Sequence, residues 1–366
     1  MTSRQFSTEK TVPPPREFQS TGFKAIDPSQ MVEEERLPFY NCNHYYPMRI
    51  GEVLKDRYQV LTKVGYGTSS NVWLCRDLRE QSYWIIKLHV NTLKHNRELE
   101  VYKHLAGVTI EHSGRLYVRR HENSFKIKSL NFLHDADVIH TDLHSDNLLI
   151  AITDDSILST VEEDEIRTPS ARKRVGDTFT YVSRYMLGGA GPLALCDLGQ
   201  ARIGKERFGN AMPMSYRAPE IILNMKWDNS VDMWGLGLLA WDLLERESLF
   251  RTYDNKSEEL NNAYHLAVMT ALLGPPPTEF LKRSKETSKY WSIDGTWNGP
   301  VPLPHEKKLQ SLARALTGDD KDDFLDFISS FLCWLPEQRL TPSQAYLHCW
   351  LRGRSNGPGM AGVLLE

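Results

Sequence analysis

The spacing of hydrophobic positions differs between the early and late parts of the chain. Short runs rich in β-branched and aromatic residues, separated by glycine and polar turns, predict antiparallel strands. These runs are RYQVLTKVGYG, SNVWLCRDL and YWIIKLHV, at 57–67, 70–78 and 83–90. Residues 96–105 follow with apolar positions on one helical face. After about residue 215 the spacing becomes mostly helical, and GPPP at 274–277 ends one of these helices.

A small strand-rich lobe before a larger helical lobe predicts an α+β fold with two lobes. The most apolar run, 231–244, is too short to cross a bilayer and contains Asp232 and Asp242, so we interpret it as a buried helix. The first 50 residues have no sustained period and are expected to form an extended tail. The aromatic residues expected to pack it partly against the rest are Phe39, Tyr40, Tyr45 and Tyr46.

Composition narrows the class of protein. At 40% hydrophobic and 25% charged residues the chain is typical of globular proteins. A formal net charge of −3 gives no basic field, so direct binding to nucleic acid gains no support. The five cysteines are odd in number and never in C-x-x-C spacing, which favours a reducing compartment over a disulfide or zinc framework. We therefore expect a cytoplasmic or nuclear monomer without membrane contact.

A glycine-containing hairpin and a strand lysine supply the first candidate chemistry. In VGYGTSSNV, Gly65 and Gly67 would let phosphate oxygens approach the backbone, although such a pair is more often a plain turn. Lys87 lies between apolar neighbours on the third predicted strand, so its charge needs a partner. Glu98 on the following helix has the better spacing for the inward face, and Glu100 is the alternative.

The stretch VIHTDLHSDNLLI at 138–150 supplies the second candidate site. Asp142 would orient an incoming hydroxyl, while Asn147 and Asp197 (in LCDLGQAR) would offer oxygen ligands to Mg²⁺. Each alone has an ordinary explanation as a turn or a cap. Their order along the chain, from glycine hairpin to strand Lys, helix Glu, H-x-D-x-x-x-x-N, D-x-G and YRAPE at 216–220, makes chance assembly remote.

With these motifs the sequence resembles eukaryotic protein kinases, and among them the SR-protein kinases and their fungal relatives. The resemblance covers residues 45 to about 352 and is carried by His-Thr-Asp at 140–142, by Ser70 at the third glycine position, by YRAPEIIL and by HLAVMTALLGPPPTEFL at 265–281. It implies ATP and Mg²⁺ as cofactors and protein Ser or Thr hydroxyls as acceptors. Arg/Ser-rich substrates are a weaker implication.

The resemblance also implies a role for each matching residue. Asp142 is the catalytic Asp, Asn147 and Asp197 are the metal ligands, and Lys87 pairs with Glu98. The implied nucleotide contacts are Val64, Gly65, Gly67, Ser70, Val72, Ile85, Lys87 and His144. Structural roles fall to Glu220 with Arg339, which should lock the activation segment, and to Asp232, which should accept backbone hydrogen bonds from the His-Thr-Asp turn. Thr141 replaces the Arg that would bind an activation-loop phosphate, so ordering should not need that modification.

Three departures bear on activity. His144 replaces a Lys that contacts the γ-phosphate, and a neutral imidazole offers one donor and no reliable charge there. Ile85 replaces the small residue over the adenine, which adds methyl groups to a fitted cavity. The interval from Glu98 to His140 is too short for the strands, hinge and helices that typically need roughly 60 residues. We interpret LYVRRHENSFKI as a strand pair, and the helix before the catalytic loop follows it almost directly. Residues 122–132 must therefore serve as the linker between the lobes. With so short a linker, ATP affinity should be poor.

These predictions divide the chain into a tail (1–50), a small lobe (51–128), a large lobe (129–352) and a C-terminal tail (353–366). An insertion at about 153–192, acidic then basic, is expected to be a solvated surface excursion. A protein serine/threonine kinase is the leading function. A pseudokinase or truncated isoform that acts as a binding scaffold is the alternative, and a small-molecule phosphotransferase is the weaker third.

Overall fold

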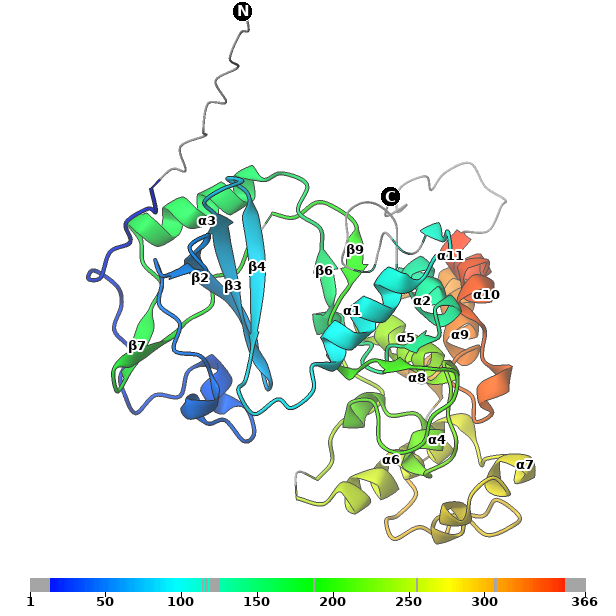
Figure 1. The fold of residues 1–366 in the computed structure, drawn as a ribbon. Coiled ribbons are helices and arrows are strands. Elements are labelled where there is room, and N and C mark those ends of the chain that lie inside the picture. The colour runs from blue at the N-terminus through cyan, green and yellow to red at the C-terminus, as the bar shows by residue number, and fades with distance from the viewer. Residues whose placement is uncertain are drawn as a thin grey trace, which may run out of the picture. The chain divides into compact units, whose positions relative to one another are not determined.

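The structure, a computed structural model, describes residues 14–113, 115, 118, 126–186, 188–254, 256–305 and 308–352. Its contacts divide the chain into two compact units, whose elements are labelled in Figure 1. The first unit comprises Met1–His95 and Ile152–Ala190, and the second comprises Asn96–Ala151 and Gly191–Glu366. The chain therefore passes from one unit to the other, back again, and then returns.

The first unit is built on an antiparallel sheet in the order β1-β2-β3-β4. Its strands are β1 Val53–Leu54, β2 Tyr58–Gly67, β3 Ser70–Asp77 and β4 Tyr83–His89. The last three confirm the strands predicted from the alternating β-branched and aromatic runs. β2 and β3 end at a tight turn, where Gly67 pairs with Ser70.

One face of this sheet is covered by a hairpin from the predicted insertion. The hairpin consists of β7 Arg172–Val175 and β8 Thr178–Tyr181, paired antiparallel. The Tyr181 ring packs edge-on against Trp73, with ring centroids 5.6 Å apart. Val60, Cys75 and Met48 complete this buried cluster. The hairpin is therefore part of the first unit's hydrophobic core.

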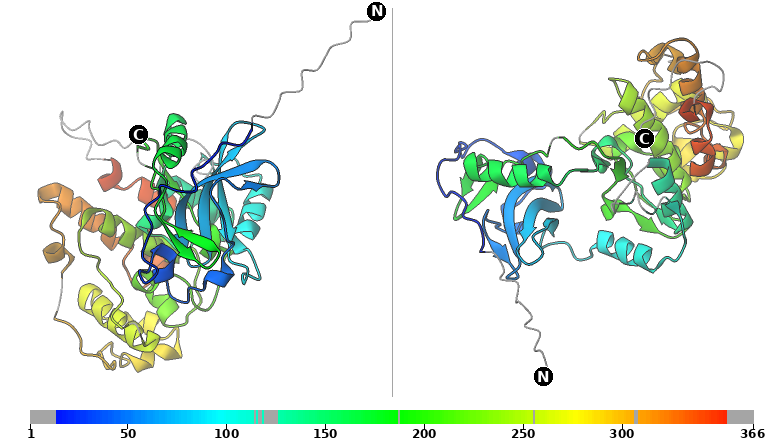
Figure 2. Two further views of the ribbon diagram at one scale, coloured as in Figure 1. Left: turned by 90° about the vertical axis from the view of Figure 1, so that its left-hand side faces the viewer. Right: turned by 90° about the horizontal axis from the view of Figure 1, so that it is seen from above.

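The opposite face carries a helix from the same insertion, α3 Ser156–Arg167, drawn green beside the sheet in Figure 2. Val161 packs with Leu61 and Leu74, while Glu162 and Glu165 are buried. The expectation that residues 153–192 form a solvated excursion is wrong. The charges of the insertion face partners on the sheet, so the segment gains both apolar burial and compensated ion pairs.

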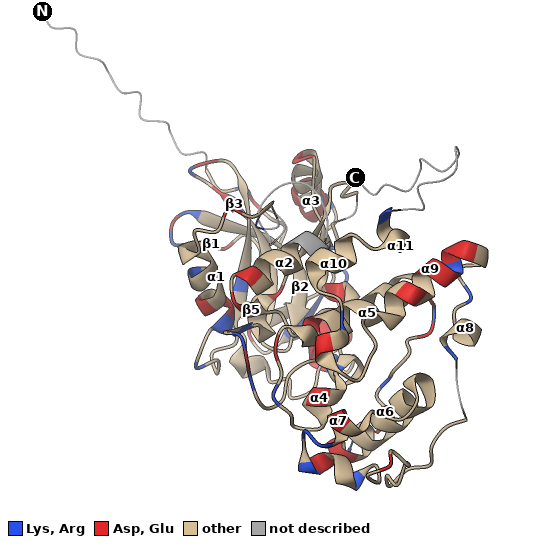
Figure 3. Ribbon diagram, turned by 90° about the vertical axis from the view of Figure 1, so that its right-hand side faces the viewer, with Lys and Arg blue, Asp and Glu red and all other residues tan. Residues whose placement is uncertain are grey.

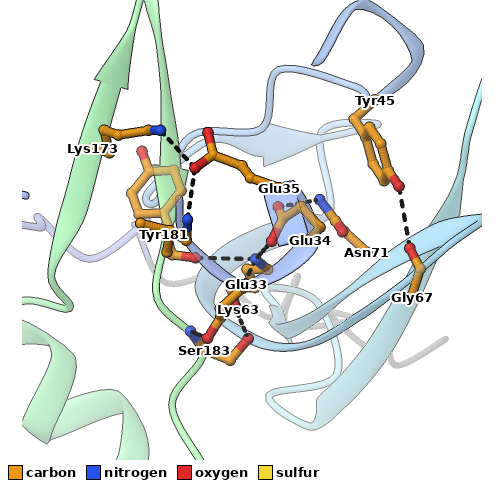
Figure 4. Close-up of polar contacts among 11 residues, drawn as sticks. Glu33, Glu34, Glu35, Tyr45, Lys63, Gly67, Asn71, Lys173, Tyr181 and Ser183 are labelled. Atoms are coloured by element: carbon orange, nitrogen blue, oxygen red, sulfur yellow. Dashed lines mark hydrogen bonds and ion pairs between the residues drawn. The ribbon is translucent and has the colours of Figure 1, made fainter. Parts of the chain in front are cut away.

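The N-terminal segment also packs on the first unit, partly through Tyr40 and Tyr45, which are half-buried as expected, and partly through other residues. Phe39 is fully exposed, which corrects its predicted packing role, whereas Val32 and Met48 are buried. The short helix Glu33–Arg36 brings three glutamates to the sheet. Lys63 of β2 donates to Glu33 at 2.8 Å and also to Glu34 (Figure 4).

The β7–β8 hairpin and the N-terminal segment are joined by the same network of ion pairs and hydrogen bonds. Lys173 of β7 donates to Glu35 at 2.5 Å, and Lys63 reaches the Tyr181 carbonyl at 3.0 Å. Tyr45 donates from its hydroxyl to the Gly67 carbonyl at 3.2 Å, at the tip of the glycine hairpin (Figure 4). The network thus joins the N-terminal segment, the sheet and the insertion into one body.

The second unit is mainly helical around a single large hydrophobic core. Its strand pairs are β5 Val138–Ile139 with β10 Arg202–Ile203, and β6 Leu148–Ile150 with β9 Leu193–Leu195. Its helices are α1 Arg97–Gly107, α2 Lys126–Asp135, α4 Pro219–Ile222, α5 Ser230–Leu244, α6 Glu258–Leu273, α7 Thr278–Leu281, α8 Leu309–Leu312, α9 Gly318–Ser329, α10 Pro342–Tyr346 and α11 Cys349–Arg352. Three of these, α1, α5 and α6, confirm the predicted helices.

The burial of α5 and the C-terminal end of α6 both follow from local sequence. α5 is apolar nearly all round, and Trp234 and Trp241 on it are almost completely buried. α6 ends at Gly274, whose φ of +78° suits glycine at a helix terminus. In the part of the chain that the structure describes, no helix is both long and apolar enough to cross a membrane.

The division between units lies elsewhere than the predicted lobe boundary at residue 128. α1 belongs to the second unit, and the insertion belongs to the first. Residues 126–132 of the expected linker belong to α2, which ends at Asp135, so this part of the prediction is wrong. Residues 119–125, which hold most of the expected strand pair and the rest of that linker, lie outside the described residues.

Candidate active site

The loop after β5 holds Asp142 and Asn147 together in the second unit. The Asn147 side-chain amide donates to the Asp142 carbonyl at 2.8 Å and to its carboxylate at 3.1 Å. A short helical turn, Ser145–Asn147, brings the Asn back toward the Asp. Because the amide nitrogen is used in this way, Oδ1 of Asn147 is turned away from Asp142 and can face a cation.

Asp232 of α5 fixes the start of this loop from beneath. It accepts the backbone N–H of His140 at 2.8 Å and that of Thr141 at 2.7 Å, which confirms the predicted role. The His134 ring nitrogen Nε2 lies 2.9 Å from the same carboxylate. The hydrogen bonds to Asp232 help Thr141 to keep a left-handed φ of +64°, a backbone conformation that would otherwise cost energy.

The buried His140 ring links the loop to the strand that precedes Asp197. Its Nδ1 accepts the backbone N–H of Asp142 at 3.2 Å, and its Nε2 lies 3.1 Å from the Cys196 carbonyl. With Nδ1 accepting, Nε2 carries the proton and donates it. Burial lowers the pKa of His140, so the neutral ring is favoured despite the nearby carboxylates.

Strand pairing brings Asp197 to the same end of the unit as Asn147. Leu148 of β6 pairs with Leu195 of β9, and the Cys196 N–H donates to the Asn147 carbonyl at 3.0 Å. Asp197 is therefore one residue beyond the position opposite Asn147. It adopts a left-handed φ of +60° and accepts the Gly199 N–H at 3.0 Å.

The face of α1 was also assigned correctly. Glu98 is buried, with 5% of its surface exposed, whereas Glu100 is exposed. Val101 and Leu105 lie on the same buried face. The predicted pairing of Glu98 with Lys87 joins residues of different units and stays a prediction.

Glu220 and Arg339 form the expected buried ion pair. The guanidinium donates to the carboxylate at 2.6 and 2.8 Å in a two-pronged contact. Both side chains are essentially inaccessible to solvent. Arg339 also donates to the Ser230 carbonyl, at 3.1 Å, and to the Cys333 carbonyl, so its charge is fully compensated.

In the first unit the sheet gathers the other predicted site residues. Gly65, Val72 and Lys87 are cross-strand partners and share one face of the sheet. Ile85 pairs with Leu74, which is the next cross-strand pair on the same face. Ser70 pairs with His89. Val64, Gly67 and Ser70 belong to the hairpin itself, as the sequence predicted.

The fold itself does not require glycine in this hairpin. A Cβ added to Gly65 would lie 3.7 Å from Val72, and one added to Gly67 would lie 3.9 Å from the Ser70 carbonyl, both ordinary contacts. Neither glycine has a positive φ. Packing therefore does not require glycine at either position, and the predicted contact of this hairpin with phosphate oxygens stays a prediction.

Known proteins provide an independent comparison. The family model described as protein kinase domain matches residues 124–351. A serine/threonine protein kinase of Aspergillus fumigatus is 34% identical over 376 positions, which cover 92% of this chain and 95% of that protein. The chain belongs to the protein kinase family. More distant relatives are a probable serine/threonine-protein kinase, clkA, of Dictyostelium discoideum and the mouse dual specificity protein kinase CLK2.

The Dictyostelium kinase is 26% identical, over 84% of this chain and 37% of that protein. The mouse kinase is 24% identical, over 82% of this chain and 64% of that protein. The crystal structure of a kinase domain aligns with a TM-score of 0.62 at 22% identity, covering 84% of this chain and 99% of that one. The kinase fold is thus shared even where sequence similarity is low.

The interval between α1 and α2 is short in this chain. Between the end of α1 at Gly107 and the start of α2 at Lys126 there are only residues 108–125. Among those described, Val118 makes a single bridge to Leu195.

Protein kinases generally use ATP and Mg²⁺, and the donors here suit that metal. Asn147 offers an amide oxygen and Asp197 a carboxylate, which are the hard ligands that Mg²⁺ prefers. Asp142 adds a second carboxylate within the same loop, already bonded to Asn147. The donor set therefore fits the magnesium site that the motifs predict.

His144 lies beside the Asp142–Asn147 pair. Its Nε2 lies 3.0 Å from the Asn147 amide and 3.5 Å from the Asp142 carboxylate. Hydrogen bonding to Asp142 and the charges of Asp142, Asp146 and Asp197 raise the pKa of His144, although burial opposes them. The predicted contact of His144 with the γ-phosphate stays a prediction.

Sequence reasoning missed some supporting contacts of this kinase site. Tyr45 was expected to pack but not to hold the Gly67 carbonyl, and His134 was not recognised as a partner of Asp232. The hydroxyl of Thr141 donates to the Gln200 carbonyl at 2.9 Å, which ties the catalytic loop to the segment after Asp197. None of these contacts has a spacing signal, because each joins distant parts of the chain.

Proposed function

We propose that this chain is an ATP-dependent protein serine/threonine kinase, which transfers the γ-phosphoryl group of ATP to protein hydroxyls. The observation that carries this proposal is the Asp142–Asn147 pair held by Asp232, with Asp197 brought alongside by the β6–β9 ladder. Family membership and the kinase relatives support it. The scaffold alternative gains no support from them.

The chemistry follows from where these groups point. The Asp142 carboxylate can accept the hydrogen bond of a Ser or Thr hydroxyl and aim its oxygen for in-line attack on the γ-phosphorus. Asn147 and Asp197 would hold Mg²⁺, which neutralises the charge on the phosphate oxygens. The bond from the γ-phosphorus to the bridging oxygen breaks as the bond to the hydroxyl oxygen forms, the hydroxyl proton passes to Asp142, and ADP leaves.

An Arg/Ser-rich acceptor is the narrower form of this proposal. The resemblance to SR-protein kinases and the similarity to CLK-type kinases support it. We also propose a cytoplasmic or nuclear location. The free state of all five cysteines is in keeping with such a reducing compartment.

The test is phosphoryl transfer by the purified full chain at millimolar Mg·ATP to matched peptides with and without Arg beside Ser. Asp142→Asn should lower the rate by about a hundredfold or more, because the amide cannot accept the hydroxyl's hydrogen bond in the same way. Asp322→Asn, an exposed position on α9, should leave the rate unchanged. Equal incorporation by wild type and Asp142→Asn would refute the assignment, and equal use of both peptides would refute the Arg/Ser preference.

A further inference from the structure

The N-terminal segment reaches the tip of the glycine hairpin, residues 64–72, through Tyr45 (Figure 4). The Tyr45 hydroxyl shares its proton between the Gly67 carbonyl, at 3.2 Å, and the Thr68 carbonyl, at 3.4 Å. Burial and the charge of Glu34 raise the pKa of Tyr45, so the hydroxyl keeps this proton at neutral pH. Tyr45 is therefore a donor that holds two successive carbonyls of the turn.

The residues before Tyr45 are themselves fixed, so its hydroxyl has a firm support. The Asn91 N–H donates to the His44 carbonyl at 2.8 Å, and the Asn91 side-chain amide donates to the Asn43 carbonyl at 3.0 Å. The Tyr45 ring packs against that of Tyr40, with ring centroids 5.3 Å apart. Tyr45 thus links the tip of the hairpin to the residues that follow β4.

The two arms of the hairpin are held separately from its tip. Glu34 accepts hydrogen bonds from Lys63 of β2 and, at 3.3 Å, from the side-chain amide of Asn71 of β3. Lys63 and Glu34 are both buried. Removal of the Tyr45 hydroxyl should therefore free the tip and leave the arms in place.

The two held carbonyls decide where the N–H groups of the turn point. In a planar trans peptide the C=O and the following N–H point in opposite directions. Because the carbonyls of Gly67 and Thr68 are turned toward Tyr45, the N–H groups of Thr68 and Ser69 are turned away from it. The Val90 N–H, which donates to the Ser69 carbonyl at 2.9 Å, fixes the far side of the turn. Successive N–H groups that share a direction form a concavity suited to an anion.

The hairpin has no charged side chain that could replace these donors. Residues 64–72, VGYGTSSNV, contain no Lys or Arg. Figure 3 shows basic positions interspersed with acidic ones along the described ribbon, rather than gathered into one basic surface. The donors that the hairpin offers to a phosphate are therefore uncharged, and a backbone N–H contributes only in the direction in which it points.

We propose that Tyr45 is a positioning residue for the phosphates of the nucleotide, because its hydroxyl orients the N–H groups of Thr68 and Ser69 toward them. The inference rests on the proposed kinase function and adds to that site a residue from outside the hairpin. Tyr45 acts through the carbonyls of Gly67 and Thr68 rather than by contact with the nucleotide. Loss of its hydroxyl should weaken the binding of phosphates and spare the binding of the nucleoside.

The test is calorimetric titration of the purified full chain with Mg·tripolyphosphate, which carries phosphates alone, and with adenosine, which carries none. Tyr45→Phe keeps the ring and should weaken Mg·tripolyphosphate binding by about two- to tenfold, the range for one hydrogen bond. Adenosine binding and the melting temperature should stay those of wild type. Tyr46→Phe is the matched control, since it removes a neighbouring hydroxyl that donates to Glu52 at 2.8 Å.

Turnover gives a second readout that a merely structural role would not separate. In Tyr45→Phe the KM for Mg·ATP should rise by the same factor, while kcat and the KM for a Ser-containing peptide stay unchanged, because binding common to ground and transition states is lost. A fall in kcat with an unchanged KM for Mg·ATP would contradict the role in positioning phosphates.

Equal binding of Mg·tripolyphosphate by wild type and Tyr45→Phe would overturn the proposal, as would the same loss in Tyr46→Phe or a parallel loss of adenosine binding. Failure of the wild-type chain to bind the probe at millimolar concentration would also refute it, since the turn would then hold no phosphate. The titrations need no turnover. A chain that shows the expected loss of binding but transfers no phosphoryl group would refute only the proposed kinase function.

Discussion

At the scale of single residues, buried charges hold the catalytic part of the second unit in place. The Glu220–Arg339 pair is inaccessible to solvent, and Arg339 additionally holds the carbonyls of Ser230 and Cys333. Asp232 satisfies two backbone N–H groups of the catalytic loop in the same way. In both cases one side chain connects segments that are far apart in sequence.

Removal of one partner of the buried Glu220–Arg339 pair should lower the stability of the fold. Arg339→Met leaves the Glu220 carboxylate buried without its cation, and we expect the free energy of unfolding to fall by about 3–5 kcal/mol. Urea unfolding followed by tryptophan fluorescence measures this, since α5 carries Trp234 next to Arg339. The double variant Glu220→Gln with Arg339→Met should recover part of the loss. A single variant as stable as wild type would contradict the role assigned to the pair.

The residues of this site were predictable because their signals are local. The spacing from His140 through Asp142 to Asn147, and the face on which Glu98 lies, follow from a few adjacent positions. The raised pKa of His144 gave no such signal, because it depends in part on Asp197, which comes from a separate segment.

At the scale of elements, α3 and the β7–β8 hairpin matter most to the first unit. Glu165 of α3 accepts from the Thr62 hydroxyl at 3.0 Å and from Arg184 at 3.0 Å. Glu162 accepts from Arg76 at 3.1 Å and from the Tyr83 hydroxyl at 2.6 Å. Both helix carboxylates therefore anchor α3 to the sheet face that also carries Val72 and Lys87.

Loss of the buried α3 charge should loosen the sheet. Glu165→Ala leaves Arg172 and Arg184 without their shared carboxylate, so we expect a loss of about 3–5 kcal/mol in the first unit. Hydrogen exchange measured by mass spectrometry should show faster exchange in β2 and β3. Asp164→Asn, an exposed acid of the same helix, is the control and should behave as wild type. Unchanged exchange in Glu165→Ala would show that α3 is not an anchor.

Elements with a regular apolar period were predictable from the sequence, whereas the insertion was not. The strands β2, β3 and β4 and the helices α1, α5 and α6 have clear periods of two or 3.6 residues and were found. The insertion was misjudged because its acids and bases look solvated in isolation, whereas Arg76 and Thr62, their partners, lie far earlier in the chain. The short interval before α2 follows from length alone, and the missing hinge and weak ATP affinity inferred from it stay predictions.

At the scale of the whole molecule, buried histidines should make stability depend on pH. Burial and the neighbouring Arg217 lower the pKa of His265 to about 3, and burial lowers that of His140. The unfolded chain binds a proton near pH 6.5, and the folded chain does not. Stability should therefore be full above pH 6.5 and fall below it, by about 2 kcal/mol between pH 7 and pH 5 for His265 alone.

Urea unfolding at pH 7 and pH 5 measures this dependence. His265→Gln cannot take up a proton, so its loss of stability between the two pH values should be smaller than that of wild type by about that amount. The comparison between variant and wild type cancels the carboxylates that titrate in the same range. Identical pH dependence for both chains would show that His265 is protonated in the folded state.

The discontinuous first unit has a consequence for biosynthesis. Its sheet is complete once His89 has left the ribosome, but both of its faces are covered by residues that end at Tyr181. At typical elongation rates the remaining residues take on the order of 5–20 s to be made. During that time the partners that bury Trp73 and Leu74 do not yet exist, while the chain already continues into the second unit. The nascent sheet therefore exposes apolar surface for that time, which makes this stage of synthesis the one most prone to aggregation.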